Sequence, residues 1–286
     1  MVYYGRTDLA SEAHSQLLQK PETVGPIRGV RAQSGQLHTL PFCAVQVLDD
    51  EGAALLKKPV GQYYTLSLPT SLPRTDAVFS EAANGVADLI RRCLPGSLCS
   101  GVLLAALGNP DITPDALGSL AASNLLVTRH LKEREASAFS DFASTALFRT
   151  GVLGTTGVES AVQLRALCDV IHPACVIAID ALAGCELEGL CRSVQICNTG
   201  IAPGSGVGND REALTRDSLG VPVIAVGVPT VMDGSALLQE VGLSDCFVTP
   251  RFIDSAVRTA ARVIAYGINL ALHPGITVPD IDLLIG

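Results

Sequence analysis

The sequence predicts an α/β fold built on a mostly parallel sheet that is covered by helices on both faces. Four runs are almost continuously apolar, as is typical of strands buried on both faces: residues 97–108, 174–184, 222–229 and, more weakly, 193–200. Helical patterns lie between them. Strands that alternate with helices form open sheets joined by right-handed crossovers.

The elements follow one another along a chain long enough for one large domain. With 286 residues, 48% of them hydrophobic, and a mean hydropathy of +0.37, we expect a single α/β domain over residues 1–286. Two short alternating runs, 42–48 and 63–68, predict a small strand-rich subregion over residues 40–70, as a half-exposed hairpin or sheet edge. Helices are expected over residues 81–94, 114–131, 158–171 and 250–272.

Charge and composition exclude several classes of protein. The net charge is −8, and the 20 basic residues form no large cluster, so the sequence predicts no nucleic-acid partner. No run of about eighteen apolar residues predicts a membrane span, and the N-terminus is charged, so we expect a cytoplasmic protein. The nine cysteines form no CxxC pair. Because Cys175 and Cys197 lie inside apolar runs, buried thiols are favoured over a metal site at Cys185, Cys191 and Cys197. No metal site and no cofactor are expected.

Polar residues follow the predicted strands where ligands of open α/β sheets bind, at the carboxyl ends. Asn109 and Asp115 come after the run 97–108, Asp180 stands inside the run 174–184, and a glycine-rich loop follows residues 193–198. We therefore expect these groups to meet at one edge of the sheet.

The glycine-rich loop reads TGIAPGSGVGNDR, from Thr199 to Arg211. It lacks the lysine of a phosphate-binding loop and the spacing of a dinucleotide fingerprint. Its glycines either supply positive φ angles for a turn or let an extended ligand such as a peptide approach the backbone.

The two carboxylates at this edge allow different interpretations. Asp115 follows Thr113 and Pro114, so it fits the first turn of a helix, where the dipole favours an acid. Asp180 interrupts an apolar run and needs either a partner or a raised pKa. Two carboxylates that share a proton can serve as base and acid. The histidines form no HxxxH pair, and no G-x-S-x-G elbow is present, which disfavours a serine hydrolase.

Several blocks of the sequence closely resemble the germination protease family of spore endopeptidases. They are RTDLA (6–10), KPVGQYYTL (58–66), LGNPDITPDALG (107–118), NLLVTRHL (124–131), GVLGTTGVES (151–160), AIDALA (178–183), TGIAPGSGVGN (199–209) and LGVPVIAVGVPTVMD (219–233). They occur in the same order and cover most of the chain.

The resemblance implies an atypical aspartic endopeptidase that cleaves small acid-soluble spore proteins after an acidic residue in the spore core. It also implies an α/β/α sandwich similar to that of the hydrogenase-maturation peptidases, assembled as a homotetramer. The family's two catalytic aspartates correspond to Asp115 and Asp180. We expect substrate binding by the following residues: Asn109, Thr199, Gly200, Gly204, Ser205, Gly206 and Gly208.

Members of the family are made as zymogens that cleave themselves at a substrate-like site. Residues 7–12 read TDLASE, a near copy of the family's Thr-Glu-(Phe/Ile)-Ala-Ser-Glu. The resemblance therefore implies a short pro-segment, residues 1–8, and autoprocessing between Asp8 and Leu9. The alternative is that Asp8 only caps a helix over residues 9–19.

Two other functions remain open from the sequence. One is a metal-dependent maturation-type peptidase in which the carboxylates bind a divalent ion, although no histidine is expected at the edge. The other is a non-catalytic paralogue that binds spore-protein peptides without cleaving them.

Overall fold

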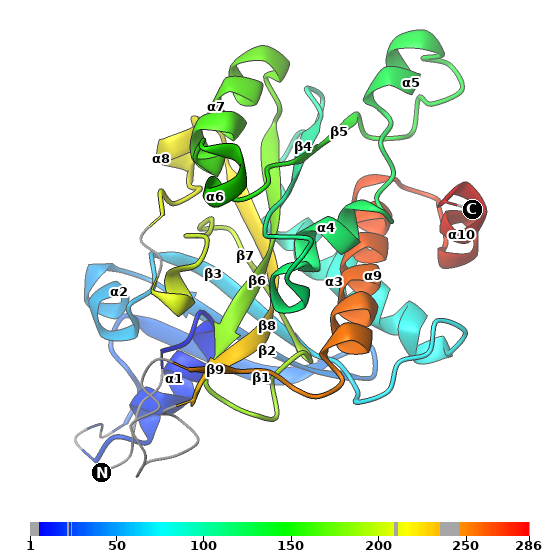
Figure 1. Cartoon of the computed structure of the whole chain (residues 1–286). Helices are drawn as coiled ribbons and strands as arrows, with labels where there is room; N and C mark the ends of the chain where they lie inside the picture. Colours follow the sequence, from blue (N-terminus) through cyan, green and yellow to red (C-terminus); the bar gives the residue numbers. More distant parts are fainter. Residues whose placement is uncertain (1–5, 22, 24, 209–210, 235–245, 286) are drawn as a thin grey trace.

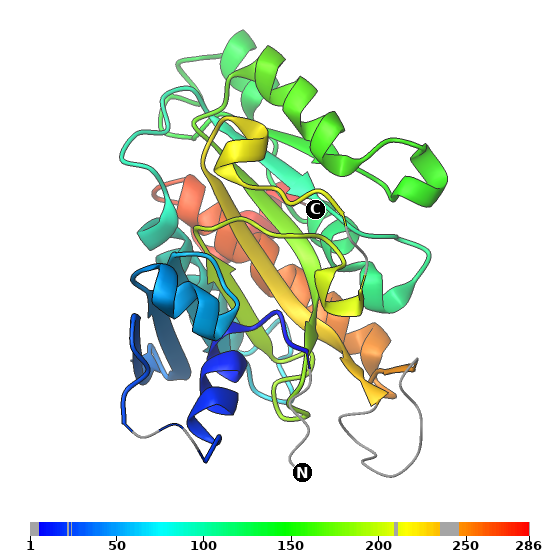
Figure 2. The ribbon, with the colours of Figure 1, turned by 90° about the vertical axis from the view of Figure 1, so that its left-hand side faces the viewer.

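The computed structural model describes residues 6–21, 23, 25–208, 211–234 and 246–285, and there the strands form one mixed sheet between two layers of helices. The strand order is β1-β2-β3-β7-β8-β6-β4-β5, and β9 pairs with β8. Figures 1 and 2 show the helices of the two layers on opposite faces of the sheet. The α/β/α sandwich is thus confirmed.

Four neighbouring strands are parallel and form the centre of the molecule. They are β8 (Val223–Asp233), β6 (Cys175–Gly184), β4 (Val102–Ala106) and β5 (Thr145–Arg149). Every residue of β4 is buried, and β6 is buried at all but one position. This is why three of these strands could be predicted from continuous apolar runs. The edge strand β5 is only partly buried and was not predicted.

The other strands extend this sheet in antiparallel fashion. They are β7 (Ser193–Cys197), β3 (Gly61–Ser67), β2 (Leu40–Val47), β1 (Val30–Leu37) and the short β9 (Phe247–Val248). Because β7 runs against β8, its carboxyl end lies opposite to the carboxyl ends of the parallel strands. The expectation that the glycine-rich loop leaves a strand at the same edge as the aspartates was wrong.

One face of the sheet is covered by α3 and α9, which pack against each other (Figure 1). The helices on this side are α3 (Ala77–Cys93), α4 (Leu117–Ala122), α9 (Ile253–Leu272) and α10 (Val278–Ile285). The largest hydrophobic cluster lies between them and the strands. The other face carries α1 (Ala10–Leu18), α2 (Asp50–Leu56), α6 (Leu153–Thr156), α7 (Ser160–Ile171) and α8 (Arg216–Leu219), as Figure 2 shows.

The single helix expected over residues 114–131 is instead three short elements. A 3-10 turn, η1 (Thr113–Asp115), leads into α4, and α5 (Arg129–Arg134) follows after an extended stretch. The buried Asn269 of α9 holds that stretch open: its Oδ1 accepts from Leu126 N at 2.9 Å, and its Nδ2 donates to Asn124 O at 2.8 Å. These bonds replace helical ones, so tertiary contacts override the helical pattern.

None of the described helices is long and apolar enough to cross a membrane.

Candidate functional site

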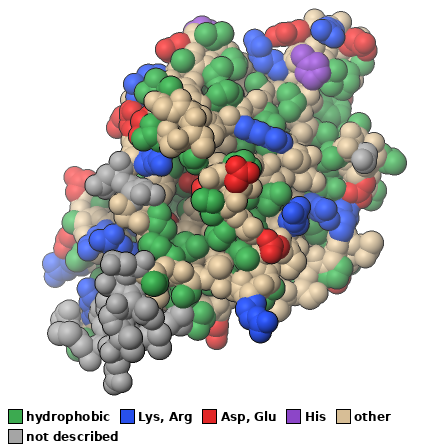
Figure 3. Space-filling model, viewed as in Figure 1, with side chains coloured by type: hydrophobic (Ala, Val, Ile, Leu, Met, Phe, Trp, Pro, Cys, Tyr) green, Lys and Arg blue, Asp and Glu red, His purple; other side chains and the backbone are tan. Residues whose placement is uncertain are grey.

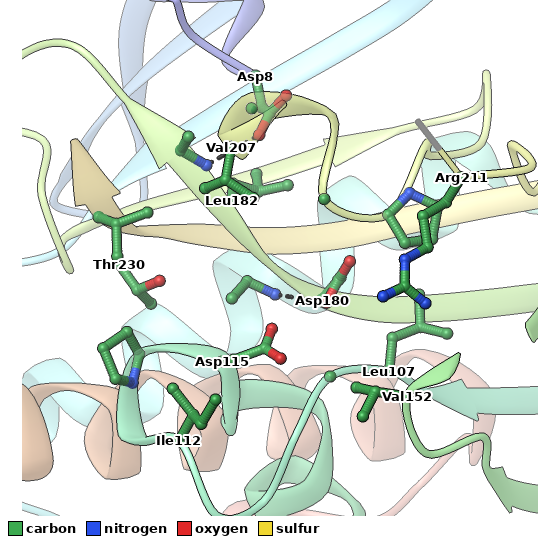
Figure 4. Close-up of a pocket in the computed structure, with 18 of the residues that line it drawn as sticks. Asp8, Leu107, Ile112, Asp115, Val152, Asp180, Leu182, Val207, Arg211 and Thr230 are labelled. Carbon is green, nitrogen blue, oxygen red and sulfur yellow. Dashed lines mark hydrogen bonds between the residues drawn. The ribbon is translucent and has the colours of Figure 1, made fainter. Parts of the chain in front are cut away.

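A cleft of about 410 Å³ opens at the carboxyl ends of β4, β6 and β8. Asp115 and Asp180 both line it, and Figure 4 shows both carboxylates pointing into it. Figure 3 shows the molecule hollowed near the centre of this face, with hydrophobic side chains around the hollow. The two aspartates that the sequence singled out are therefore brought together from positions far apart in the chain.

Asp115 is positioned by the turn that follows β4. Asn109 N donates to Asp115 Oδ2 at 2.8 Å. The turn passes so close that a Cβ on Gly108 would lie 2.0 Å from Asp115 O, and Gly108 has a φ of +89°. Only glycine fits such a position without strain. The Gly-Asn pair after β4 thus orients the first carboxylate through the backbone.

Asp180 lies within β6 and is 3% exposed. Its Oδ1 accepts a hydrogen bond from Ala181 N at 2.9 Å. Its strand neighbour on β8 is Gly227, where a Cβ would come within 2.7 Å of Asp180 O. The strand therefore holds a carboxyl group in an interior position that most acidic side chains avoid.

The electrostatics of the pair are unequal. Burial raises the pKa of Asp180 well above its usual value, and the Asp115 carboxylate raises it further. Burial also raises the pKa of Asp115, but the Asn109 N–H and the Arg211 guanidinium act in the opposite direction. Both pKa values are raised, and burial acts most strongly on Asp180, so the two carboxyl groups resist double ionisation as a pair.

The cleft is also lined by Arg211 and Thr230, two residues that the sequence did not identify as functional. The Arg211 side chain extends toward the pair (Figure 4) and interacts electrostatically with both carboxylates. Thr230 is 1% exposed, and its Oγ1 has no hydrogen-bond partner. Pairing between β6 and β8 shifts register here, with Leu182 opposite Pro229 and Ala183 opposite Val231, so Thr230 is the extra residue.

Such bulges redirect side chains next to active sites. Figure 4 shows the Thr230 hydroxyl directed into the same space as Asp115. The apolar strand pattern gave no signal of a bulge, because the register shift depends on pairing with β6.

The glycine-rich loop reaches the cleft by running back from the opposite edge of the sheet. Gly204 and Gly206 line the cleft, whereas Thr199 and Gly200 lie with Ser205 around a second cavity of about 290 Å³. Gly208 lines neither cavity. A Cβ on Gly206 would lie 2.3 Å from Asp8 Oδ2. Here the glycine permits close approach of a peptide segment, which is one of the two interpretations of this loop.

Asn109 contributes to the site differently from the expectation. It does not line the cleft; its side-chain Oδ1 accepts from Asp111 N at 3.0 Å. Its backbone N–H, by contrast, holds Asp115.

Asp8 also lines the cleft, and its side chain does not cap a helix. The first helix begins at Ala10 with Leu9 as its N-cap and without a side-chain cap. Asp8 Oδ2 instead accepts from Ala183 N at 2.8 Å, and Oδ1 accepts from Ser205 Oγ at 3.0 Å. The capping alternative for Asp8 was wrong.

Across the part of the chain that the structure describes, no group of three or more His, Cys, Asp and Glu side chains is arranged to hold a metal ion. Cys175 and Cys197 are buried in strands, as expected for small apolar side chains.

The fold and the cleft define an α/β protein in which a buried and a partly buried carboxyl group line one cleft. Comparison with known proteins gives the family. The model of the germination protease family matches residues 7–241. The chain is 39% identical to a germination protease of Caldanaerobacter subterraneus subsp. tengcongensis, covering 98% of each chain. It is 32% identical to one of Clostridium perfringens, covering 98% of this chain and 99% of the relative.

The chain therefore belongs to the germination protease family, and it is a peptidase. Among solved structures, a [NiFe] hydrogenase maturation protease, HycI from Thermococcus kodakarensis, superposes with a TM-score of 0.36 at 16% identity, covering 63% of this chain and 98% of that one. This score is too low to indicate a shared fold by itself.

Proposed function

We propose that this chain is an aspartic-type endopeptidase in which Asp115 and Asp180 share one proton. The observation that carries the proposal is the pair itself: one carboxyl group on the turn after β4 and one within β6 line the same cleft, and the Asp115 carboxylate raises the pKa of Asp180. A pair with separated pKa values supplies a base and an acid at the same pH.

In this mechanism the ionised Asp115 takes a proton from a water molecule as its oxygen adds to the carbonyl carbon of the peptide bond. The oxyanion that develops accepts a hydrogen bond from the unpartnered Thr230 hydroxyl. Asp180 then gives its proton to the departing amine nitrogen as the C–N bond breaks. The products are a carboxylic acid and an amine, and the proton on Asp115 restores the shared state.

The substrates that we propose are small acid-soluble spore proteins, cut after an acidic residue in the spore core. The name of the curated relatives, germination protease, supports a role in germination, and the family resemblance implies the substrates. We also propose that the active form is a homotetramer, as the family resemblance implies; sedimentation analysis of the purified chain would detect it.

Self-cleavage between Asp8 and Leu9 is part of the same proposal. It is supported by the position of Asp8, which lines the cleft that contains the pair. Residues 1–5 of the pro-segment lie outside the described residues. Intact mass should show loss of residues 1–8 during activation; an active enzyme that retains them would contradict this step.

The decisive experiment uses a peptide containing Thr-Glu-Phe-Ala-Ser-Glu and the variants Asp115→Asn and Asp180→Asn. Each substitution should lower kcat by about 10²–10⁴-fold, the usual contribution of one general acid or base. Wild-type rates in both variants would show that the pair is not catalytic.

A further inference from the structure

The second cavity, of about 290 Å³, lies between the sheet and the glycine-rich loop, on the face that carries α1 and α2. Side chains of β3, β7 and β8 line it, among them Tyr63, Cys197 and Ala225. Two hydrogen bonds fix the loop above it: Ile201 N donates to Leu214 O at 3.0 Å, and Leu214 N donates to Ile201 O at 2.7 Å. Preformed cavities of this kind are the usual sites for small molecules.

Two consecutive lysines bring positive charge to this cavity. Lys57 and Lys58 both line it, and Asp8 is the single acid that does so among the described residues. Lys57 is the C-cap of α2 and has a φ of 55°, in the left-handed region. Glycine or asparagine usually takes this position, and other residues in strained conformations cluster at active sites and ligand sites. The turn thus points to a role for the lysines in binding.

Lys58 is a partly buried cation whose protein partners are incomplete. Its Nζ donates to Thr7 O at 3.0 Å, which uses one of the three donors of an ammonium group. Asp8 and Glu12 attract it, but no acid in the ranges that the structure describes forms an ion pair with it. Burial lowers the pKa of Lys58. An anion in the cavity would oppose that effect, because a buried charge is stabilised by an opposite charge.

The remaining walls divide into a polar and an apolar part. Thr199 and Ser205 carry hydroxyl groups, and both line this cavity rather than the cleft with the carboxyl pair. Leu182, Ala202 and Ala225 form the apolar part. The volume is at the lower end of the range for ligand pockets, so the ligand is smaller than a peptide of several residues. A ligand that matches both parts has one anionic group and a small apolar body.

We propose that the second cavity binds a small organic carboxylate, with its carboxylate at Lys58 and its apolar body beneath the glycine-rich loop, against Ala202. The 3-10 turn η2 (Ser205–Val207) separates the two cavities: Ser205 lines the second, and Gly206 lines the cleft. A bound ligand therefore supports one wall of the cleft. The inference goes beyond the proposed function, because binding here requires no cleavage.

The test measures binding to the full-length chain by fluorine NMR. The probe is para-fluorophenylacetate, and the control ligand is para-fluorophenylacetamide, which has nearly the same shape and no charge. We expect the acid to bind with a Kd of about 1 mM, as is usual for a ligand of this size. The amide should bind at least about tenfold more weakly, because it cannot pair with the ammonium.

Two variants of the chain locate the ligand. Lys58→Met should raise the Kd of the acid by about tenfold or more, because it removes the cation and keeps an apolar stem. Its matched control is Lys57→Met, which removes the same charge from the exposed neighbour and should change the Kd by less than about threefold.

Ala202→Leu fills the apolar part and should abolish binding, which provides a test if Lys58→Met does not fold. Its control is Ala166→Leu, at an exposed position of α7 that lines neither cavity, with a change in Kd of less than about threefold.

The inference is overturned if the acid does not bind at millimolar concentration, or if the acid and the amide bind equally. It is also overturned if a folded Lys58→Met or Ala202→Leu variant binds the acid like the wild type. Selective binding to a chain that cleaves no peptide would instead refute the proposed function and leave this site intact. Peptide cleavage by a chain that does not bind the acid would do the reverse.

Discussion

Gly118 packs against the backbone of Leu107 and Ile179, close to the carboxyl pair, and its substitution by alanine should displace both Asp115 and Asp180. A Cβ at this position would lie 2.4 Å from Leu107 O and 2.6 Å from both Leu107 N and Ile179 O. Leu107 N and Ile179 O are hydrogen-bonded to each other at 3.0 Å, immediately before Asp180 in β6. Gly118 itself lies in α4, three residues after Asp115.

The size of the effect follows from these distances. Ordinary contact begins at 3.4 Å, so the helix and the two strands must separate by about 1 Å, and every clashing atom is backbone that cannot rotate away. Overpacking of this kind lowers the free energy of unfolding by about 1–3 kcal/mol. The higher helix propensity of alanine offsets about 1 kcal/mol of that loss. A displacement of about 1 Å between catalytic groups lowers activity by about 10²-fold.

The assay combines urea unfolding with kcat/KM on a peptide substrate. The free energy of unfolding should fall by up to about 2 kcal/mol, and kcat/KM should fall much more than the folded fraction does. Gly96→Ala is the control, because a Cβ there meets nothing within 4 Å. If Gly118→Ala kept the kcat/KM of the wild type, the close approach of α4 would not be what positions the pair.

Three further predictions concern the cleft. Thr230→Val should lower kcat by about 10²–10³-fold, as loss of one oxyanion donor does, with KM nearly unchanged; a fall in unfolding free energy without a change in kcat would make the hydroxyl structural. Asp180→Asn should stabilise the fold increasingly as the pH rises. Because the pKa of Asp180 is higher in the folded than in the unfolded state, its contribution to the free energy of unfolding is complete below the unfolded-state pKa. The wild type loses this contribution as the pH rises to the folded-state pKa, at about 1.4 kcal/mol per pH unit, whereas the Asn variant does not. Equal unfolding free energies for this variant and the wild type from pH 4 to 8 would contradict that pKa shift. Peptide cleavage should survive removal of divalent ions by a chelator; a loss that added Zn²⁺ or Mg²⁺ restores would support the metal-dependent alternative.

The sequence by itself predicted the central strands and identified Asp180 as a candidate functional residue. Strands buried on both faces need continuous apolar runs, so β4, β6 and β8 are visible in composition alone. A carboxyl group inside such a run conflicts with its surroundings wherever the rest of the chain lies. The resemblance to a family added Asp115, which local patterns explained equally well as a helix-start residue.

Only the tertiary structure decided the direction of β7, the break in the helix expected over residues 114–131, and the partners of the carboxyl pair. The direction of a strand depends on the neighbour with which it pairs, and the break depends on Asn269, more than a hundred residues away. Thr230 enters the cleft because two strands shift register, and Asp8 lies there because it meets Ala183 and Ser205. Sequence patterns report the burial of a residue and its local backbone; contacts between distant segments arise from packing, which no local pattern encodes.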